Sequence, residues 1–296
     1  MARPTFLLGI VPLYGLGVAL AVHAGTAFRP LPAALGLVLV WSVQLMTHYY
    51  NEFHDLETDR ETPPGGITGG SQVLVDGLVP PETARRLGRV ALASVVTLTA
   101  VTVLATAQGW VLVAIVLAAT AAGWGYSTPP VRLVAKGVGE VTNAVVAGAL
   151  VPLTGFLLQT GTVAGIRLRP LVPVVLLAFG LALATALPDA EPDAATGKLT
   201  LTARLGPGRA GTVAAVSILL GAGLLVGPIG ELVPLLGRVA LGGTVAVALV
   251  GLPFGLALAD GEGTGADLFA ILATLAVGAL LILLVGALLL GAGVHF

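Results

Sequence analysis

Apolar residues occur in long runs that fill the chain almost from end to end. The runs cover residues 5–24, 33–52, 89–107, 109–126, 137–159, 170–188, 209–228, 234–258 and 267–291. A bilayer core needs roughly 20 mostly apolar residues per helix. The pattern therefore predicts an all-α fold: a polytopic membrane bundle of about nine transmembrane helices, with residues 1–296 forming a single integral-membrane domain.

Polar residues interrupt these runs at helical spacing, mainly near the end of the second run. Five of them recur at steps of four, three, four and four: Gln44, His48, Asn51, Asp55 and Asp59. At this spacing they share one narrow helix face. Shorter stripes recur on the fifth predicted span (Lys136, Glu140, Asn143) and on the sixth (Thr185, Asp189, Asp193). Polar groups at membrane depth normally face a bundle interior or a wet cavity, so we expect three helices to line one polar pocket.

The composition agrees with a membrane protein and narrows the function. Hydrophobic residues make up 56 % of the chain, charged residues 10 %, and the mean hydropathy is +1.01. A soluble domain carries about 25 % charged residues. The net charge of −1 and the absence of a basic run give no sign of nucleic-acid binding. With no cysteine, disulfides and thiolate metal sites are excluded.

Acidic residues are rare and clustered. Of 15 Asp and Glu residues, eight fall within residues 51–61 and 189–193. Both clusters contain an Asp-x-x-x-Asp pair at the end of a span, Asp55 and Asp59 in the first and Asp189 and Asp193 in the second. Four facing carboxylates would repel one another unless cations lie between them. Oxygen ligands in a wet site suit Mg²⁺, which commonly bridges one or two carboxylates to substrate phosphates. We therefore predict that these four aspartates hold Mg²⁺ against a polyanion.

The distribution of Lys and Arg predicts the orientation. With nine spans, the N-terminus and the loops after spans two, four, six and eight share one side of the membrane. That side carries ten cations, namely Arg3, Arg60, Arg85, Arg86, Arg89, Arg132, Lys136, Lys198, Arg204 and Arg209. The other side carries only Arg29, Arg167, Arg169 and Arg238. Because cytoplasmic loops are enriched in Lys and Arg, we expect both acidic clusters, and the central cavity between them, to face the cytoplasm.

A prenyl diphosphate is a substrate that fits both the charged and the apolar parts of such a pocket. Its tail would lie along the apolar walls, and breakage of its allylic C–O bond builds negative charge that metal ions and cations stabilise. Lys198, Arg60, Arg132 and Lys136 are candidate partners for the phosphates. The carbocation would need shielding from water and an aromatic face. The candidate aromatic residues are Tyr49, Tyr50, Phe53, Trp124 and Tyr126, and the sequence does not choose among them.

Ordinary structural roles compete with several of these assignments. Lys198 is also a plausible topology anchor, and His48, Gln44 and Asn143 are plausible hydrogen-bonding partners between helices. Glu52 and Glu57 point away from the aspartate face at helical spacing, which predicts simple surface charges. The link from Glu61 to Gly88 is the longest in the chain, and we interpret it as a lid over the cavity.

At the paired motifs the chain resembles the UbiA-type intramembrane prenyltransferase superfamily. Asn51, Asp55 and Asp59 match its Asn-Asp-x-x-Asp-x-x-x-Asp motif, with Glu52 where Asp is usual, and Asp189 and Asp193 match its Asp-x-x-x-Asp motif. Three segments look most like the branch that prenylates 1,4-dihydroxy-2-naphthoate in menaquinone synthesis: 69–77, 126–133 and 197–206. The resemblance implies a nine-span bundle, Mg²⁺ on the four aspartates, and Asn51 as a diphosphate or metal ligand. Two departures, Pro130 where a basic residue is common and Thr185 where Asn is common, put the acceptor in doubt.

Three functions stay open at this point. The first is Mg²⁺-dependent transfer of a polyprenyl group to an aromatic acceptor, most readily dihydroxynaphthoate. The second is a membrane terpene cyclase that uses the same ionisation step without an acceptor. The third is a cation transporter, for which only Glu140 suggests an acid deep in a span. Membrane lipids surround the protein in all three cases, and the sequence leaves the prenyl chain length and the oligomeric state open.

Overall fold

The computed structural model describes residues 4–61, 71–164, 171–232 and 263–292, together with residues 238, 242 and 243. Within these residues the secondary structure is helical, as predicted. The long helices are α1 (Pro4–His23), α2 (Pro30–His54), α4 (Pro81–Thr106), α5 (Trp110–Ser127), α8 (Leu171–Ala186), α11 (Pro207–Leu232) and α13 (Gly263–Gly291). One further span is continuous from α6 (Gly139–Val145) through a π-helical turn (Val146–Leu150) to α7 (Val151–Thr160).

Eight helices in the described part of the chain are long and apolar enough to cross a membrane. They correspond to predicted spans one to seven and nine. The predicted span 234–258 lies outside the described residues, apart from three positions, so the count of nine stays a prediction. The third span begins at Pro81, earlier than the predicted residue 89. Proline is favoured in the first turn of a helix, and Pro80 and Pro81 begin this one ahead of its apolar run.

Glycines allow the spans to pack closely. Gly17 of α1 lies against the backbone of Pro152 and Phe156 in α7, and Gly155 of α7 lies against the backbone of Tyr14 in α1. A Cβ at either glycine would overlap the facing helix, so only glycine permits this approach. A glycine also allows close packing of α8 against α11, where Gly180 faces the backbone of Ala214.

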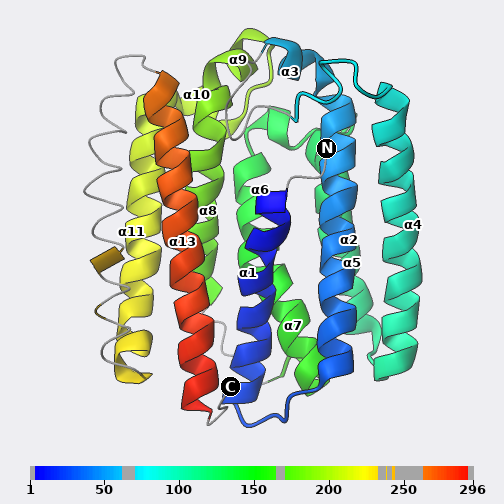
Figure 1. Ribbon diagram of the computed structural model, residues 1–296, viewed down its shortest axis with the longest axis vertical. Coiled ribbons are helices and arrows are strands. Elements are labelled where there is room, and N and C mark those ends of the chain that lie inside the picture. Colours follow the sequence, from blue (N-terminus) through cyan, green and yellow to red (C-terminus); the bar gives the residue numbers. More distant parts are fainter. Residues whose placement is uncertain are drawn as a thin grey trace.

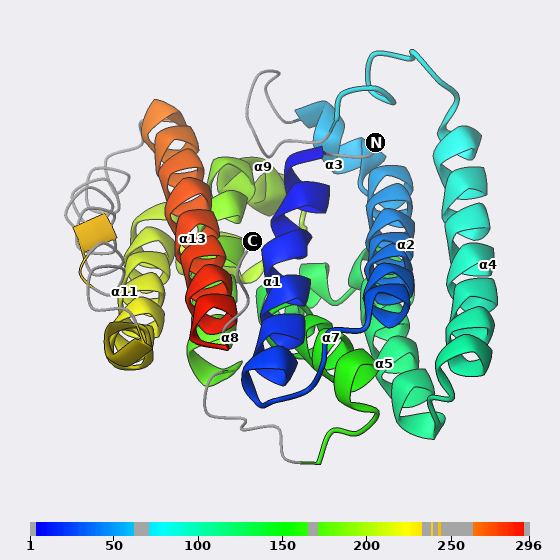
Figure 2. The ribbon, with the colours of Figure 1, turned by 60° about the horizontal axis from the view of Figure 1, so that its bottom comes forward.

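The buried apolar residues form two large groups. The larger group joins α1, α8, α11 and α13 around the fully buried Phe269. The second joins α2, α4, α5 and α7 around Leu39, Leu112 and Leu157. Figure 2 shows α8, α11 and α13 on one side of α1 and α7, and α2, α4 and α5 on the other.

Short helices gather at one end of the bundle (Figure 1, top). They are α3 (Leu56–Glu61), α9 (Ala190–Ala195) and α10 (Leu201–Leu205). Two interruptions of longer helices produce α3 and α9. The second span ends at His54 and Asp55 caps it, after which the chain turns into α3. The sixth span gives way to a 3-10 turn, Leu187–Asp189, at Pro188, because proline lacks the N–H that a continuing helix needs. Both predicted aspartate motifs therefore lie where a span breaks at this end.

Candidate active site

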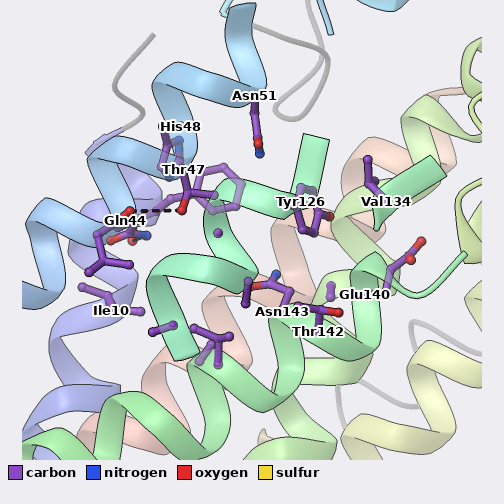
Figure 3. A pocket seen from close by; sticks show the side chains of 18 of the residues that line it. Ile10, Gln44, Thr47, His48, Asn51, Tyr126, Val134, Glu140, Thr142 and Asn143 are labelled. Atoms are coloured by element: carbon purple, nitrogen blue, oxygen red, sulfur yellow. Dashed lines mark hydrogen bonds between the residues drawn. The ribbon is translucent and has the colours of Figure 1, made fainter. Parts of the chain in front are cut away.

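A cavity of about 310 Å³ opens inside the bundle between the two apolar groups. Ten of the thirteen predicted site residues line it, namely Gln44, His48, Asn51, Asp55, Asp59, Tyr126, Asn143, Asp189, Asp193 and Lys198. Figure 3 shows Asn51 pointing into this space from α2, with Tyr126 of α5 and Asn143 of α6 bordering it. The polar stripes expected on three different spans thus face one shared space, except for Lys136 of the fifth-span stripe.

Lys198 joins the two aspartate motifs. Its Nζ lies 3.3 Å from Oδ2 of Asp55 and 3.3 Å from Oδ1 of Asp193. These carboxylates come from the second and sixth spans. Because one ammonium touches both, the motifs are close enough to bind a single small polyanion together. The side chains of Lys198 and Asp55 are each 12 % exposed and that of Asp193 is 4 % exposed, so water screens these ion pairs only weakly.

The surroundings of Lys198 keep it charged. Burial disfavours its ammonium form, but the carboxylates of Asp55 and Asp193 outweigh that effect and raise the pKa of Lys198 above its usual range. Ser127, at the end of α5, donates a hydrogen bond from Oγ to Oδ2 of Asp55 at 3.2 Å. This end of the cavity therefore holds a fixed positive charge with its carboxylates oriented around it.

The turn that carries Lys198 is built by local hydrogen bonds. Gly197 has φ of +75°, a left-handed conformation that glycine adopts without strain. The backbone N of Lys198 donates to the carbonyl of Asp193 at 2.8 Å. Thr200 then caps α10, its Oγ1 accepting from the backbone N of Ala203 at 3.0 Å. These contacts fold the chain back after α9, which brings Lys198 over the motif that precedes it.

The oxygen-rich lining fits a hard divalent cation. The four aspartates line the cavity, and carboxylates are preferred ligands of Mg²⁺. The buried Oδ1 of Asn51 has no hydrogen-bond partner among the described residues, so it is available to a ligand. In the described part of the chain, no three acidic or histidine side chains converge tightly enough to hold an ion alone. Mg²⁺ is commonly bound by one or two carboxylates plus substrate phosphates, so the carboxylates and the Asn51 oxygen that line the cavity fit it.

Deeper polar residues connect the second span to the first. Gln44 donates from Nε2 to the carbonyl of Phe6 at 2.9 Å, as expected of a residue that joins helices. Its Oε1 is buried without a partner among the described residues. His48 also lines the cavity, and its ring lies 5.8 Å from the ring of Phe6. Gln44 and His48 therefore contact α1 and also line the cavity.

The prediction that Glu52 is a surface charge is wrong. Glu52 is 6 % exposed and borders the cavity. Its Oε1 accepts hydrogen bonds from Ser71, from the backbone N at 3.0 Å and from the side-chain hydroxyl. Helical periodicity missed this contact because the chain after α3 folds back over α2.

Glu57 is exposed, as predicted. The predicted lid, Glu61–Gly88, is only partly described, but Ser71 shows that its second half begins against α2.

Three predicted phosphate partners do not line the cavity. Arg60 in α3, Arg132 and Lys136 are all exposed. Nζ of Lys136 lies 3.4 Å from the carbonyl of Pro130 on the protein surface. The sequence placed these cations near the motifs along the chain, but Arg60 within α3, and Arg132 and Lys136 after α5, lie outside the lining. Their contact with phosphate stays a prediction.

Sequence reasoning did not propose Ser127 or Thr200 as site residues. Ser127 bonds to Asp55, and Thr200 lines the cavity beside Lys198. Both lie inside segments that carry the family resemblance, which is the only signal that could have drawn attention to them. Glu140 was noted within a polar stripe and as an acid deep in a span, but not as a site residue, and it is 2 % exposed and lines the cavity.

The rest of the wall is largely apolar. It is formed by residues such as Ile10, Leu39, Val40, Val43, Ile115, Val116, Val146, Leu150 and Val151. They come from α1, α2, α5 and the fifth span, and they lie deeper in the bundle than the aspartates. A ligand with a charged head and a hydrocarbon tail matches this division.

Comparison with known proteins places the chain in a family. The profile of the UbiA prenyltransferase family matches residues 10–267. A 1,4-dihydroxy-2-naphthoate octaprenyltransferase from Bacillus subtilis (strain 168) is 26 % identical over 220 residues, which cover 73 % of this chain and 68 % of that protein.

Solved structures share the fold. The apo structure of a UbiA homolog from Aeropyrum pernix K1 superposes with a TM-score of 0.67 at 19 % identity, covering 95 % of this chain and 98 % of that one. A UbiA homolog from Archaeoglobus fulgidus bound to GPP and Mg²⁺ gives a TM-score of 0.60 at 20 % identity, covering 95 % and 97 %. The chain is thus an all-helical integral membrane protein of this architecture. It belongs to the UbiA prenyltransferase family, and it is a prenyltransferase.

Proposed function

We propose that this protein catalyses Mg²⁺-dependent transfer of a polyprenyl group from its diphosphate to an aromatic acceptor, with 1,4-dihydroxy-2-naphthoate as the acceptor. One observation carries the proposal. Lys198 contacts Asp55 and Asp193 at 3.3 Å each, at the polar end of a cavity whose remaining wall is largely apolar. This is the arrangement that binds a diphosphate head and accommodates an isoprenoid tail.

Asp55, Asp59, Asp189 and Asp193 would hold Mg²⁺, with Asn51 supplying a further oxygen. When bound, the metal supplies positive charge that stabilises the departing diphosphate. The structure of the Archaeoglobus fulgidus homolog bound to GPP and Mg²⁺ supports this assignment by analogy of fold.

The chain's own residues would bind the substrate and shield the allylic cation from water. Lys198 donates charge-assisted hydrogen bonds to the phosphate oxygens, which are anionic when the allylic C–O bond breaks. The apolar wall around Val43 and Ile115 binds the tail and keeps water from the allylic cation. Tyr126 offers an aromatic face beside the polar end. The acceptor would enter next to this face, and Gln44, His48 and Asn143 are the proposed polar contacts for substrate.

The acceptor assignment is supported by the Bacillus subtilis relative, a 1,4-dihydroxy-2-naphthoate octaprenyltransferase. It would place the protein in menaquinone biosynthesis at the cell membrane. The excess of Lys and Arg on the side of the aspartate motifs supports a cavity that opens to the cytoplasm.

The experiment uses purified protein with Mg²⁺ and a prenyl diphosphate, with and without a panel of aromatic acceptors, followed by mass spectrometry of the products. The proposal predicts a prenylated product only when acceptor is present, with dihydroxynaphthoate the best. Transfer to a different aromatic acceptor alone would overturn the acceptor assignment. Release of a cyclic hydrocarbon or alcohol without acceptor would instead establish the terpene cyclase alternative.

The transporter alternative has lost its main support. It depended on Glu140 as an acid deep in a span. Glu140 lies in the first turn of the fifth span, and one of its oxygens accepts two hydrogen bonds from Thr202.

A further inference from the structure

A buried carboxylate outside the two aspartate motifs ties the fifth span to the segment that follows Lys198. Glu140 lies in α6 and is 2 % exposed. Its Oε1 accepts hydrogen bonds from the backbone N of Thr202 at 3.1 Å and from Thr202 Oγ1 at 3.2 Å. Thr202 is fully buried in the first turn of α10. The contact joins two segments that are far apart in the sequence and meet only in the folded chain.

From Thr202 the hydrogen bonds continue back to Lys198. Thr200 caps the same turn of α10, and its backbone N donates to the carbonyl of Lys198 at 2.9 Å. The backbone N of Lys198 in turn donates to the carbonyl of Asp193 at 2.8 Å. The turn is therefore held on one side by α9 and on the other by Glu140. Without Glu140, α10 would lose these two hydrogen bonds to the fifth span.

Because the side chain of Lys198 is long, the position of its ammonium depends on how firmly the turn is attached. A lysine ammonium sits on a flexible stem with several rotatable bonds, so its position depends on where its backbone is fixed. In the structure the ammonium reaches Asp55 on one side and Asp193 on the other. A small shift of the turn would lengthen at least one of these contacts, and electrostatic stabilisation is strongest when charges are placed in advance.

We propose that Glu140 is a positioning residue that anchors the start of α10, so that Lys198 is held between the two aspartate motifs to receive the diphosphate. The inference deepens the proposed function and rests on its assignment of Lys198 to the phosphates. Glu140 acts on Lys198 by way of Thr202, through the two hydrogen bonds that its Oε1 accepts.

The hydrogen-bond pattern also specifies the informative substitutions. Both hydrogen bonds end on one oxygen, so the amide oxygen of Glu140→Gln can accept them, whereas Glu140→Ala removes the acceptor. Thr202→Val removes only the hydroxyl donor and leaves the backbone N. Thr212→Val is a matched control, because Thr212 in α11 bonds only to the carbonyl of Gly208 in its own helix.

The test is a double-mutant cycle on the binding of inorganic diphosphate, measured by calorimetry in the presence of Mg²⁺. The cycle compares wild type, Glu140→Ala, Lys198→Ala and the double variant. We expect Lys198→Ala to weaken binding about tenfold, since a charge-assisted contact is lost. Glu140→Ala should weaken it about fivefold through loss of preorganisation. In the Lys198→Ala background, Glu140→Ala should then have almost no further effect, because coupled residues are non-additive.

Further variants separate positioning from stability. Glu140→Gln should restore binding to near the wild-type value, Thr202→Val should weaken it by less than Glu140→Ala, and Thr212→Val should leave it unchanged. Thermal unfolding of each variant is followed in parallel. If Glu140→Ala does not fold, Thr202→Val takes its place in the cycle.

Additive losses in the cycle would overturn the inference, as would a Glu140→Gln variant that binds as weakly as Glu140→Ala. Normal binding by Lys198→Ala would also overturn it. None of these results bears on prenyl transfer itself, which is judged separately from product formation and its loss on replacement of Asp55.

Discussion

At the polar end of the cavity, acidic side chains outnumber cations. Six carboxylates, those of Glu52, Asp55, Asp59, Glu140, Asp189 and Asp193, border it, against one ammonium from Lys198 in the described lining. A diphosphate adds further negative charge, so Lys198 alone does not balance the site. A bound divalent cation would offset this local excess of negative charge. This charge balance supports the proposal that diphosphate binds together with a divalent metal ion.

Replacing Asp55 or Asp189 by Ala should lower turnover on the order of 10²-fold or more, because a group that holds the stabilising charge is lost. The measurement is the steady-state rate of prenyl transfer by purified variants. Glu57→Ala, which removes an exposed carboxylate near the first motif, is the control and should change the rate little. Near-normal turnover by either aspartate variant would show that its motif does not hold the charge.

Side-chain type and spacing predicted much of the polar lining of the cavity. Asp55, Asp189 and Lys198 could be found because charges are rare in this chain and these recur at span ends. Arg60 and Arg132 met the same criteria but lie outside the lining. Whether a cation near a span end turns inward depends on the turns that follow the helix, such as the one at Gly197, and these are not set by periodicity.

At the scale of elements, hydropathy located the eight described spans and most of their ends, but it missed the start of the third span at Pro81 and the break after the second span. The second span continues to His54, and a capping turn at Asp55 separates it from α3. A straight helix would present Glu52 away from the aspartates, but the returning chain places Ser71 against it. Contacts between distant segments decide such details, and local sequence does not record them.

The contact between Glu52 and Ser71 predicts a stability effect. Glu52→Ala should lower the temperature of thermal unfolding measurably, because it leaves the Ser71 donors without their partner, at a cost of about 1–3 kcal/mol if they stay buried. Glu57→Ala removes a nearby exposed carboxylate and should have little effect. Equal unfolding temperatures for both variants would mean that the contact does not hold this segment.

At the scale of the whole molecule, both aspartate motifs lie at one end of the bundle (Figure 1). The predicted orientation turns that end to the cytoplasm. The chain contains no cysteine, so single cysteines report topology without background. Two exposed positions mark the two ends: Ala195 in α9, beside the motifs, and Thr162 after α7, at the opposite end.

In intact bacterial spheroplasts, a membrane-impermeant maleimide should label Thr162→Cys and should label Ala195→Cys only after the membrane is permeabilised. The reason is that the reagent reaches only the outer face. Labelling of Ala195→Cys in intact cells, with Thr162→Cys protected, would reverse the orientation.

The central claim is that aspartates of two different spans hold diphosphate through Mg²⁺. Its most direct test is the initial rate of diphosphate release from a prenyl diphosphate plus acceptor, titrated with Mg²⁺, for wild type, Asp59→Asn and Asp193→Asn. The account predicts no release in excess chelator, a rate that rises with Mg²⁺ in the wild type, and a loss on the order of 10²-fold in both variants, one from each motif. Release that persists without divalent metal, or a full rate in either variant, would contradict it.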